Sequence, residues 1–285
     1  MVRTTVQELA AAVEEPPRQY VVHERDQDHL LAADEMPDPI PLIDLSRLTA
    51  ADEAHKLREA LQTWGLFLVT NHGIEESLVD AMMSASRDFF RQPSEEKHKC
   101  SNLVDDGKHL EVEGYGNDKV VSPQDQGLSW NDRLHLRVEP EDERNFAKWP
   151  THPESFRDVL LEYASRTKRI RDLILRSIAK ILDLDEDYFV NQISNKRDGK
   201  WYNVPAKPYT LVINLADCME IMCNGIFMSP VHRVVTNATK ERLSLGVFYV
   251  VDGETVLEPA PGLLDDKRPP RYRKFKAMDF GFSFE

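Results

Sequence analysis

Two β-rich runs separated by a turn constrain the fold of the C-terminal third of this chain. Residues 229–236 read Ser-Pro-Val-His-Arg-Val-Val-Thr, and residues 241–245 read Glu-Arg-Leu-Ser-Leu. The stretch 237–240, Asn-Ala-Thr-Lys, lies between them and has the composition of a turn. Runs of this kind on both sides of a turn predict two neighbouring antiparallel strands.

One face of the predicted strand pair carries polar side chains suited to a binding site. With the turn centred on residues 237–240, His232 lies opposite Ser244, and Val234 lies opposite Arg242. Because side chains two apart on a strand share a face, His232, Arg242 and Ser244 are predicted to point into one cavity. An imidazole is a suitable ligand for Fe(II), whereas an arginine fork beside a hydroxyl suits a carboxylate.

This pattern resembles the C-terminal motif of the plant non-haem Fe(II)/2-oxoglutarate-dependent dioxygenases. Similar stretches follow in the family's order along most of the chain, at residues 39–46, 64–74, 113–116, 198–201 and 224–227. The stretch Trp130–Pro140 is most similar to the grass group that includes triketone-herbicide-hydroxylating oxygenases, with norcoclaurine-synthase-like proteins nearby. The resemblance implies that His232 is an iron ligand and that Arg242 and Ser244 hold the distal carboxylate of 2-oxoglutarate. Fe(II) and 2-oxoglutarate are then expected as cofactor and cosubstrate, for the oxidation of a small organic molecule.

The family's iron centre needs more ligands than this pattern supplies. It is a facial triad of two His and one carboxylate, and a His-x-Asp motif provides the first His and the carboxylate. None of the nine histidines in this chain is followed two residues later by Asp. Two His-x-Glu pairs exist, His109 with Glu111 and His152 with Glu154. Their positions, before a Gly-Tyr-Gly turn and at the start of a long helix, favour surface or capping roles.

The missing ligands belong between the segments Leu184–Phe189 and Asp198–Trp201. Members of the resembled family carry there a Tyr-Tyr-Pro-Pro-Cys-Pro stretch, the His-x-Asp strand, a Gly-Leu-Gln-Val strand and a tyrosine that helps to hold 2-oxoglutarate. This chain has only residues 190–197 in that interval. Family members also continue into a further helix after the segment that ends here at Lys274, whereas this chain stops at Glu285. The resemblance therefore implies a shortened member, either a splice form or the product of an imperfect gene model.

Two functions from different classes are compatible with these residues. The first is a working oxygenase that recruits an unexpected carboxylate and histidine for iron. The second is a non-catalytic remnant that binds a partner or a small acid, or merely an aberrant gene product. The absence of His-x-Asp favours the second for this chain, and no catalytic residue is assigned.

The composition limits which classes of partner the protein can bind and in which cellular compartment it is expected. The net charge of −13 and the pI near 5.2 argue against nucleic acid or anionic membranes as partners. Three cysteines, an odd number, favour packed, reduced thiols in the cytoplasm. The N-terminal residues lack the apolar run of a signal peptide, and no stretch is long enough for a membrane span. A monomer acting on a small molecule is expected.

The expected fold class is α+β. Apolar periodicity predicts helices over about 5–13, 50–63, 76–91 and 154–182, and strands over 40–45, 66–70, 133–138 and 211–215. The longest helix, termed the spine helix, is expected to pack its apolar stripe against the sheet. Asn224-Gly225 predicts a hairpin turn. Ala216, where family members have Gly, would add strain if the backbone there needs a positive φ.

Four parts are expected along the chain. Residues 1–37 form an N-terminal helix and linker, and residues 38–150 correspond to the family's N-terminal domain. Residues 151–196 hold the spine helix and its connection, and residues 197–285 are the remnant of the dioxygenase domain. The strands of this last part are expected to form a double-stranded β-helix, or jelly roll, that the missing block leaves incomplete.

Overall fold

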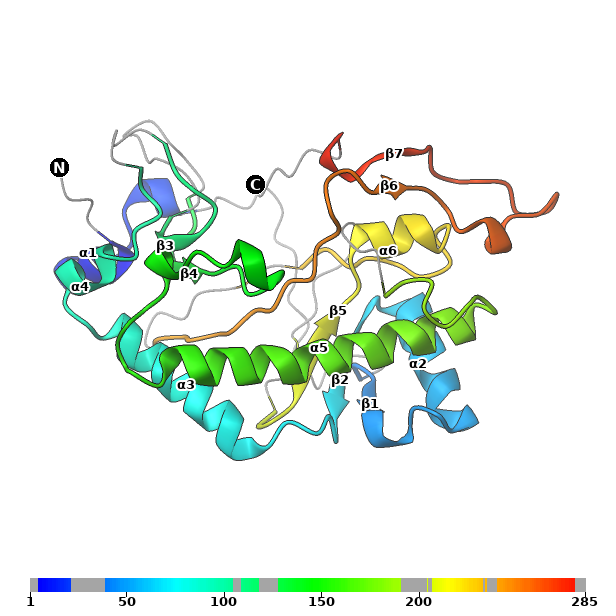
Figure 1. Cartoon of the computed structure of the whole chain (residues 1–285), viewed down its shortest axis with the longest axis horizontal. Coiled ribbons are helices and arrows are strands. Elements are labelled where there is room, and N and C mark those ends of the chain that lie inside the picture. The colour runs from blue at the N-terminus through cyan, green and yellow to red at the C-terminus, as the bar shows by residue number, and fades with distance from the viewer. Residues whose placement is uncertain are drawn as a thin grey trace.

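The computed structural model describes residues 5–21, 39–104, 109–117, 128–190, 204, 207–232, 234 and 240–279, and it has an α+β architecture (Figure 1). A three-stranded sheet lies at its centre, in the order β1-β2-β5. Strands β1 (Leu42–Asp44) and β2 (Leu66–Thr70) are parallel, and β5 (Leu211–Asn214) pairs antiparallel with β2. The run Leu66–Thr70 is thus a buried strand as predicted, with its three central residues at most 1% exposed.

The helices cover this sheet and extend away from it. They include α2 (Ala51–Thr63), α3 (Glu76–Phe90) and α5 (Phe156–Ile181), each within two residues of its predicted bounds, with Leu182 as the C-cap of the spine helix. The spine helix α5 lies lengthwise beside α3 (Figure 1), and its main packing partners are α3 and α2 rather than the sheet. Leu173, an apolar residue of this helix, is 37% exposed because it is rotated by about 100° from the buried Ile174.

The N-terminal helix α1 (Val6–Ala12) is capped at both ends. Thr5 and Glu8 form a capping box, and Val13 is the C-cap. The carboxylate of Asp132 accepts the amide hydrogens of Val6 and Gln7 at 2.9 Å each, which fastens the helix to the segment before β4. Close by lie α4 (Ser94–His98), a short helix that is not among the predicted ones, and the antiparallel pair β3 (Gly114–Gly116) and β4 (Arg133–His135).

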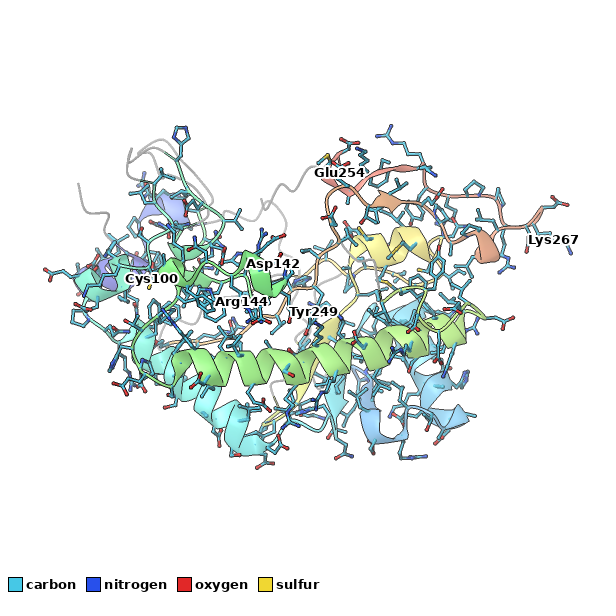
Figure 2. All side chains as sticks on the ribbon, in the orientation of Figure 1. Cys100, Asp142, Arg144, Tyr249, Glu254 and Lys267 are labelled. Atoms are coloured by element: carbon cyan, nitrogen blue, oxygen red, sulfur yellow. The ribbon has the colours of Figure 1, made fainter. Side chains whose placement is uncertain are left out.

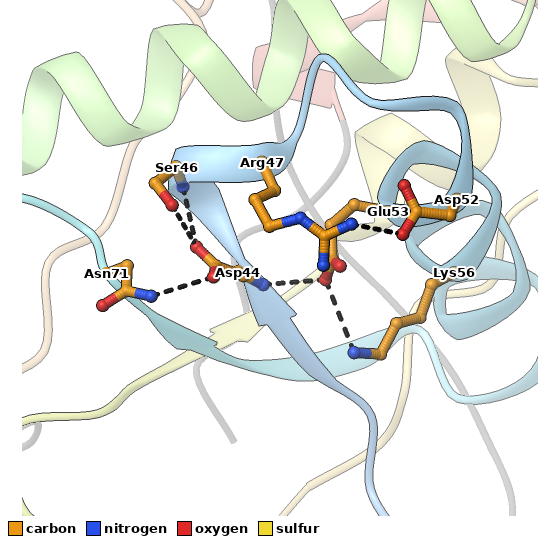
Figure 3. A network of polar contacts seen from close by, with 7 residues as sticks. All are labelled: Asp44, Ser46, Arg47, Asp52, Glu53, Lys56 and Asn71. Atoms are coloured by element: carbon orange, nitrogen blue, oxygen red, sulfur yellow. Dashed lines mark hydrogen bonds and ion pairs between the residues drawn. The ribbon is translucent and has the colours of Figure 1, made fainter.

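A polar network holds the end of β1 against α2 (Figure 3). The backbone N–H of Asp44 donates to Glu53 Oε1 at 2.8 Å, so the carboxylate of Glu53 is satisfied although that residue is only 5% exposed. The Asp44 carboxylate accepts from the Ser46 hydroxyl at 2.7 Å and from the Asn71 amide at 2.9 Å. These bonds fix the direction in which the chain leaves β1.

The C-terminal half departs from the predicted strands at two places. Residues 217–222 form a helix, α6 (Asp217–Met222), and Asn224 and Gly225 terminate it with φ of 53° and 69°. The predicted hairpin turn is therefore wrong, because left-handed residues also end helices, and here the Gly225 N–H donates to Glu220 O at 2.7 Å. Ala216 is unstrained, with φ of −108° in extended backbone at the helix start.

The predicted jelly roll is not formed by the described residues. Beyond α6 the described chain has only the short antiparallel pair β6 (Val256–Leu257) and β7 (Phe275–Lys276). Residues 229–232 and 240–250 carry no strand, so the predicted pairing across the turn is not formed by its described part, and residues 233 and 235–239 lie outside the description. Short 3-10 helices complete the fold, at residues 18–20, 45–47, 141–143, 146–148, 261–263 and 277–279.

The three cysteines are packed thiols, as predicted. Cys218 and Cys223 are fully buried and Cys100 is 6% exposed, and none forms a disulfide. The sulfur of Cys223 accepts the Phe227 N–H at 3.4 Å in the turn after α6. Burial raises the pKa of the Cys223 thiol to about 11.

Gly65, in the turn before β2, has no space for a side chain. Gly65 has φ of 64°, and a Cβ there would collide with the Met228 carbonyl oxygen and lie 2.8 Å from Pro230 Cδ. Gly73 has φ of 75°, but a Cβ at that position would have no atom within 4 Å, so Gly73 is a matched control. We expect Gly73→Ala to cost about 1–2 kcal/mol of unfolding free energy from the left-handed backbone alone. Gly65→Ala should cost clearly more in urea unfolding, and equal losses would contradict this packing.

The buried Cys223 predicts a dependence of stability on alkaline pH. Because its pKa is raised on folding, its contribution is fully present below the pKa of the unfolded thiol and is lost as the pH rises toward about 11. We expect the urea midpoint of the native chain to fall more steeply between about pH 9 and pH 11 than that of Cys223→Ala. Parallel pH profiles of the two proteins would contradict the burial of this thiol.

Candidate functional site

The chain is firmly anchored just before the predicted iron ligand. The buried Ser229 donates from its hydroxyl to Leu215 O at 3.2 Å and from its N–H to Glu220 Oε2 at 2.8 Å. The other oxygen of Glu220 accepts from the Tyr272 hydroxyl at 2.6 Å. Burial, followed by this hydrogen bond to a carboxylate, raises the pKa of Tyr272. Glu220 thus ties α6 to the chain on both sides of the candidate site.

Beyond this anchor His232 is exposed. Its Nδ1 lies 3.2 Å from the carbonyl oxygen of Pro230, two residues earlier. A bond donated from Nδ1 to that carbonyl leaves Nε2 as the ring nitrogen with a free lone pair. His232 therefore presents a ligand atom to solvent.

Arg242 and Ser244 lie side by side, as the sequence predicts. The Nη1 of Arg242 donates to the Ser244 hydroxyl oxygen at 3.2 Å, and both residues are exposed. Within the described part of the chain, no hydrogen bond or ion pair joins this pair to His232. The structure therefore keeps the predicted carboxylate-binding pair together but leaves it open to water, whereas a working clamp needs a closed cavity.

The residues present do not fit an iron ion. In the described ranges no three His, Cys, Asp or Glu side chains come together in a group that could hold a metal. His72, another histidine, has a structural role. It accepts the Ile74 N–H at Nδ1 and lies 3.0 Å from Tyr209 O through Nε2, so it stabilises the turn after β2.

The two His-x-Glu pairs also serve the fold. Glu111 forms an ion pair with Lys148 at 2.6 Å. The carbonyl of His152 accepts from the Gln92 side chain at 3.1 Å, three residues before the cap of α5. The ion pair of Glu111 agrees with the predicted surface role, whereas the N-cap of α5 is Ser155 rather than His152 or Glu154.

Two cavities in the described structure lie elsewhere. One, of about 220 Å³, is lined by residues that include Cys100, Trp149 and Arg157, and burial raises the pKa of the Cys100 thiol. The other, of about 340 Å³, lies between the segment around Arg144 and the middle of α5. Figure 2 shows Cys100 beside α1 and α4, and Arg144 above α5. His232, Arg242 and Ser244 line neither cavity.

The way in which residues 242–251 lie on the protein was not predicted from the sequence. Exposure alternates along this segment except at Val247, which is 42% exposed: Leu243, Leu245 and Tyr249 are partly buried and Val251 is buried, whereas Arg242, Ser244, Gly246, Phe248 and Val250 are exposed. The Arg171 guanidinium of α5 lies over the Tyr249 ring at 4.7 Å, so the inward face rests on the spine helix (Figures 1 and 2). A period of two along this segment is the signal that places Arg242 and Ser244 together on the outward face.

Comparison with known proteins identifies what the chain resembles. Residues 40–153 match the family described as "non-haem dioxygenase in morphine synthesis N-terminal", and residues 171–250 match the 2OG-Fe(II) oxygenase superfamily. The chain is 31% identical to 2-oxoglutarate-dependent dioxygenase 11 of Oryza sativa subsp. japonica, over 96% of this chain and 90% of that protein. It is 32% identical to S-norcoclaurine synthase 1 of Coptis japonica, over 93% and 86% respectively.

A solved structure shares the fold over nearly the whole chain. The crystal structure of JOX2 in complex with 2OG, Fe and JA superposes with a TM-score of 0.82 at 26% identity. The match covers 98% of this chain and 93% of that one. None of the described helices combines the length and the apolar composition that a membrane span needs.

The exposure of the Arg242–Ser244 pair predicts weak binding of 2-oxoglutarate. In water an ion pair with a single guanidinium contributes little, because the solvent screens it. We expect no saturable rise in melting temperature with 2-oxoglutarate up to millimolar concentrations, and the same flat response for Arg242→Ala. A saturable rise that Arg242→Ala abolishes would show instead that the pair lies in a closed pocket.

Proposed function

This chain belongs to the plant 2OG-Fe(II) oxygenase family, and from that membership we propose that it is a non-catalytic member that no longer turns over 2-oxoglutarate. The family acts on small organic molecules, with Fe(II) and 2-oxoglutarate supplying the oxidation chemistry when bound. One observation carries the proposal: no histidine in the sequence begins a His-x-Asp motif. A single imidazole cannot replace a three-ligand face, since both the geometry and the neutralising charge come from the absent residues.

The length of the chain relative to its family supports the loss of a block. The alignment with the rice dioxygenase spans 328 positions, which exceeds the 285 residues of this chain by 43. At least that many positions of the alignment therefore have no counterpart here. We place the loss between the spine helix α5 and Asp198–Trp201, where the sequence lacks the family's iron-binding strand, although residues 191–203 lie outside the described structure.

The finer assignments follow from the same resemblance. We place the chain in the grass group that includes triketone-herbicide-hydroxylating oxygenases, and the rice protein among its relatives supports this placement. His232 is proposed as the surviving iron-ligand position, and Arg242 with Ser244 as the surviving 2-oxoglutarate positions. The four parts 1–37, 38–150, 151–196 and 197–285 are kept as the proposed division of the chain.

A second candidate function is a working oxygenase that recruits other ligands beside His232. The observation that favours it is the fold, because the likeness to an oxygenase crystallised with 2OG and Fe extends over 98% of the chain. The two functions differ in one measurable property, which is Fe(II)-dependent formation of succinate from 2-oxoglutarate.

We expect the chain to bind no stoichiometric Fe(II) at micromolar metal concentrations, because it lacks two of the three iron ligands. We also expect no iron-dependent formation of succinate. Metal analysis and succinate assays should give the same result for the native chain, for His232→Ala and for His55→Ala, which removes an exposed histidine of α2. An intact family member assayed in parallel shows that the conditions support turnover. One equivalent of Fe(II), retained in His55→Ala but lost in His232→Ala, together with succinate, would overturn the proposal.

The origin of the shortening needs a separate experiment. Sequencing the transcript and the genomic DNA around Lys196 distinguishes a true deletion from an imperfect gene model. We expect the transcript to join Lys196 directly to Arg197. An in-frame block encoding His-x-Asp at this place would restore the family's triad, and the non-catalytic assignment would then fail for the natural protein.

A further inference from the structure

The segment 241–251 has a backbone without partners in the described part of the chain. No described residue exchanges a backbone hydrogen bond with any of its N–H or C=O groups. Its outward face is apolar at one end, where Phe248 is 77% exposed and Val250 is 68% exposed. Folded proteins usually protect such an edge with charges, a proline or a covering element, because unpaired backbone groups pair readily with another strand.

This segment carries neither charge nor proline over nine residues. The run Leu243–Val251 reads Leu-Ser-Leu-Gly-Val-Phe-Tyr-Val-Val. Such a composition has a high propensity for strands and pairs well with copies of itself. The side chains of Leu243, Leu245, Tyr249 and Val251 already rest against the protein, with Tyr249 under Arg171, so the segment is held in place for a partner strand although Val247 is 42% exposed.

The charges at the two ends of the run specify one partner and one direction. Arg242 precedes the run and Asp252 follows it, and both are exposed. If an identical segment lies antiparallel, with residues 242 and 252 opposite each other, each guanidinium faces a carboxylate. The same register places Gly246 opposite Phe248, so each ring covers a residue without a side chain. A parallel pair would instead oppose like charges at both ends.

We propose that residues 242–252 form a two-fold symmetric, antiparallel strand pair with the same residues of a second copy of this chain. The interface is isologous, because the same edge serves both copies. It recognises its partner by main-chain hydrogen bonds along the edge and by two Arg242–Asp252 pairs at the ends. A dimer is thus proposed where the sequence led us to expect a monomer. The proposal does not depend on whether the chain binds iron.

The test exchanges the two charges. By sedimentation, the native chain should shift with concentration from 32.8 kDa to twice that mass. Arg242→Asp and Asp252→Arg should each weaken the dimer, raising its dissociation constant about tenfold, which corresponds to the loss of about 1.4 kcal/mol. The double variant should restore it, because both pairs return with their signs reversed. An equal mixture of the two single variants should form a heterodimer about as strong as the native dimer, because an aspartate of one variant then faces an arginine of the other at both ends.

A second pair of variants tests the edge itself. Val250→Lys places a charge on the outward face and should abolish the dimer, whereas Val112→Lys, at a residue 62% exposed elsewhere, should leave it intact. Circular dichroism verifies that each variant is folded. A monomer at every concentration, a dimer that Val250→Lys leaves unchanged, or loss of dimer without rescue by the double variant would each overturn the proposal.

Discussion

The pairing of β2 with β5 is the contact on which the rest of the molecule depends. It joins the N-terminal strands to the C-terminal half of the chain, and the bond from Leu215 N–H to Gly65 O at 2.8 Å continues it past the end of the strand. Met228 N–H then donates to Leu61 O at 3.2 Å, so the chain is held to α2 as far as the segment before His232. The segment that carries the candidate site is positioned by these few bonds and by the side chains that follow them.

The need of backbone N–H and C=O groups for hydrogen-bond partners explains why the candidate site lies open to solvent. A strand is stable only when its N–H and C=O groups have partners, and residues 241–251 have none among the described residues. Packing of Tyr249 and Leu245 holds the segment on the protein without closing a cavity over its other face. Arg242 and Ser244 consequently meet water, and the positions that correspond to the family's cosubstrate clamp become part of an exposed edge. The proposed loss of function and the proposed pairing surface thus follow from one absent set of strands.

Local patterns predicted most of the elements, and long-range partners explain the failures. The apolar periodicity of α5 and the run Leu66–Thr70 depend on neighbours within the element, so both were predicted nearly to the residue. Asn224-Gly225 carries only a left-handed preference, which a hairpin and a helix end share, and the burial of α6 decided between them. The His232–Ser244 pairing failed for a different reason. The sequence pattern of a strand indicates that a segment can pair. It does not indicate whether the partner strands are present in the chain.

The central claim is that residues 241–251 lack backbone partners within the described chain. Hydrogen–deuterium exchange of the backbone amides, at a concentration low enough to keep the chain monomeric, tests it directly. We predict that the amides of 241–251 exchange nearly as fast as in an unfolded peptide, while those of Leu66–Thr70 are protected. Protection of residues 241–251 equal to that of Leu66–Thr70 in the monomer would contradict the account.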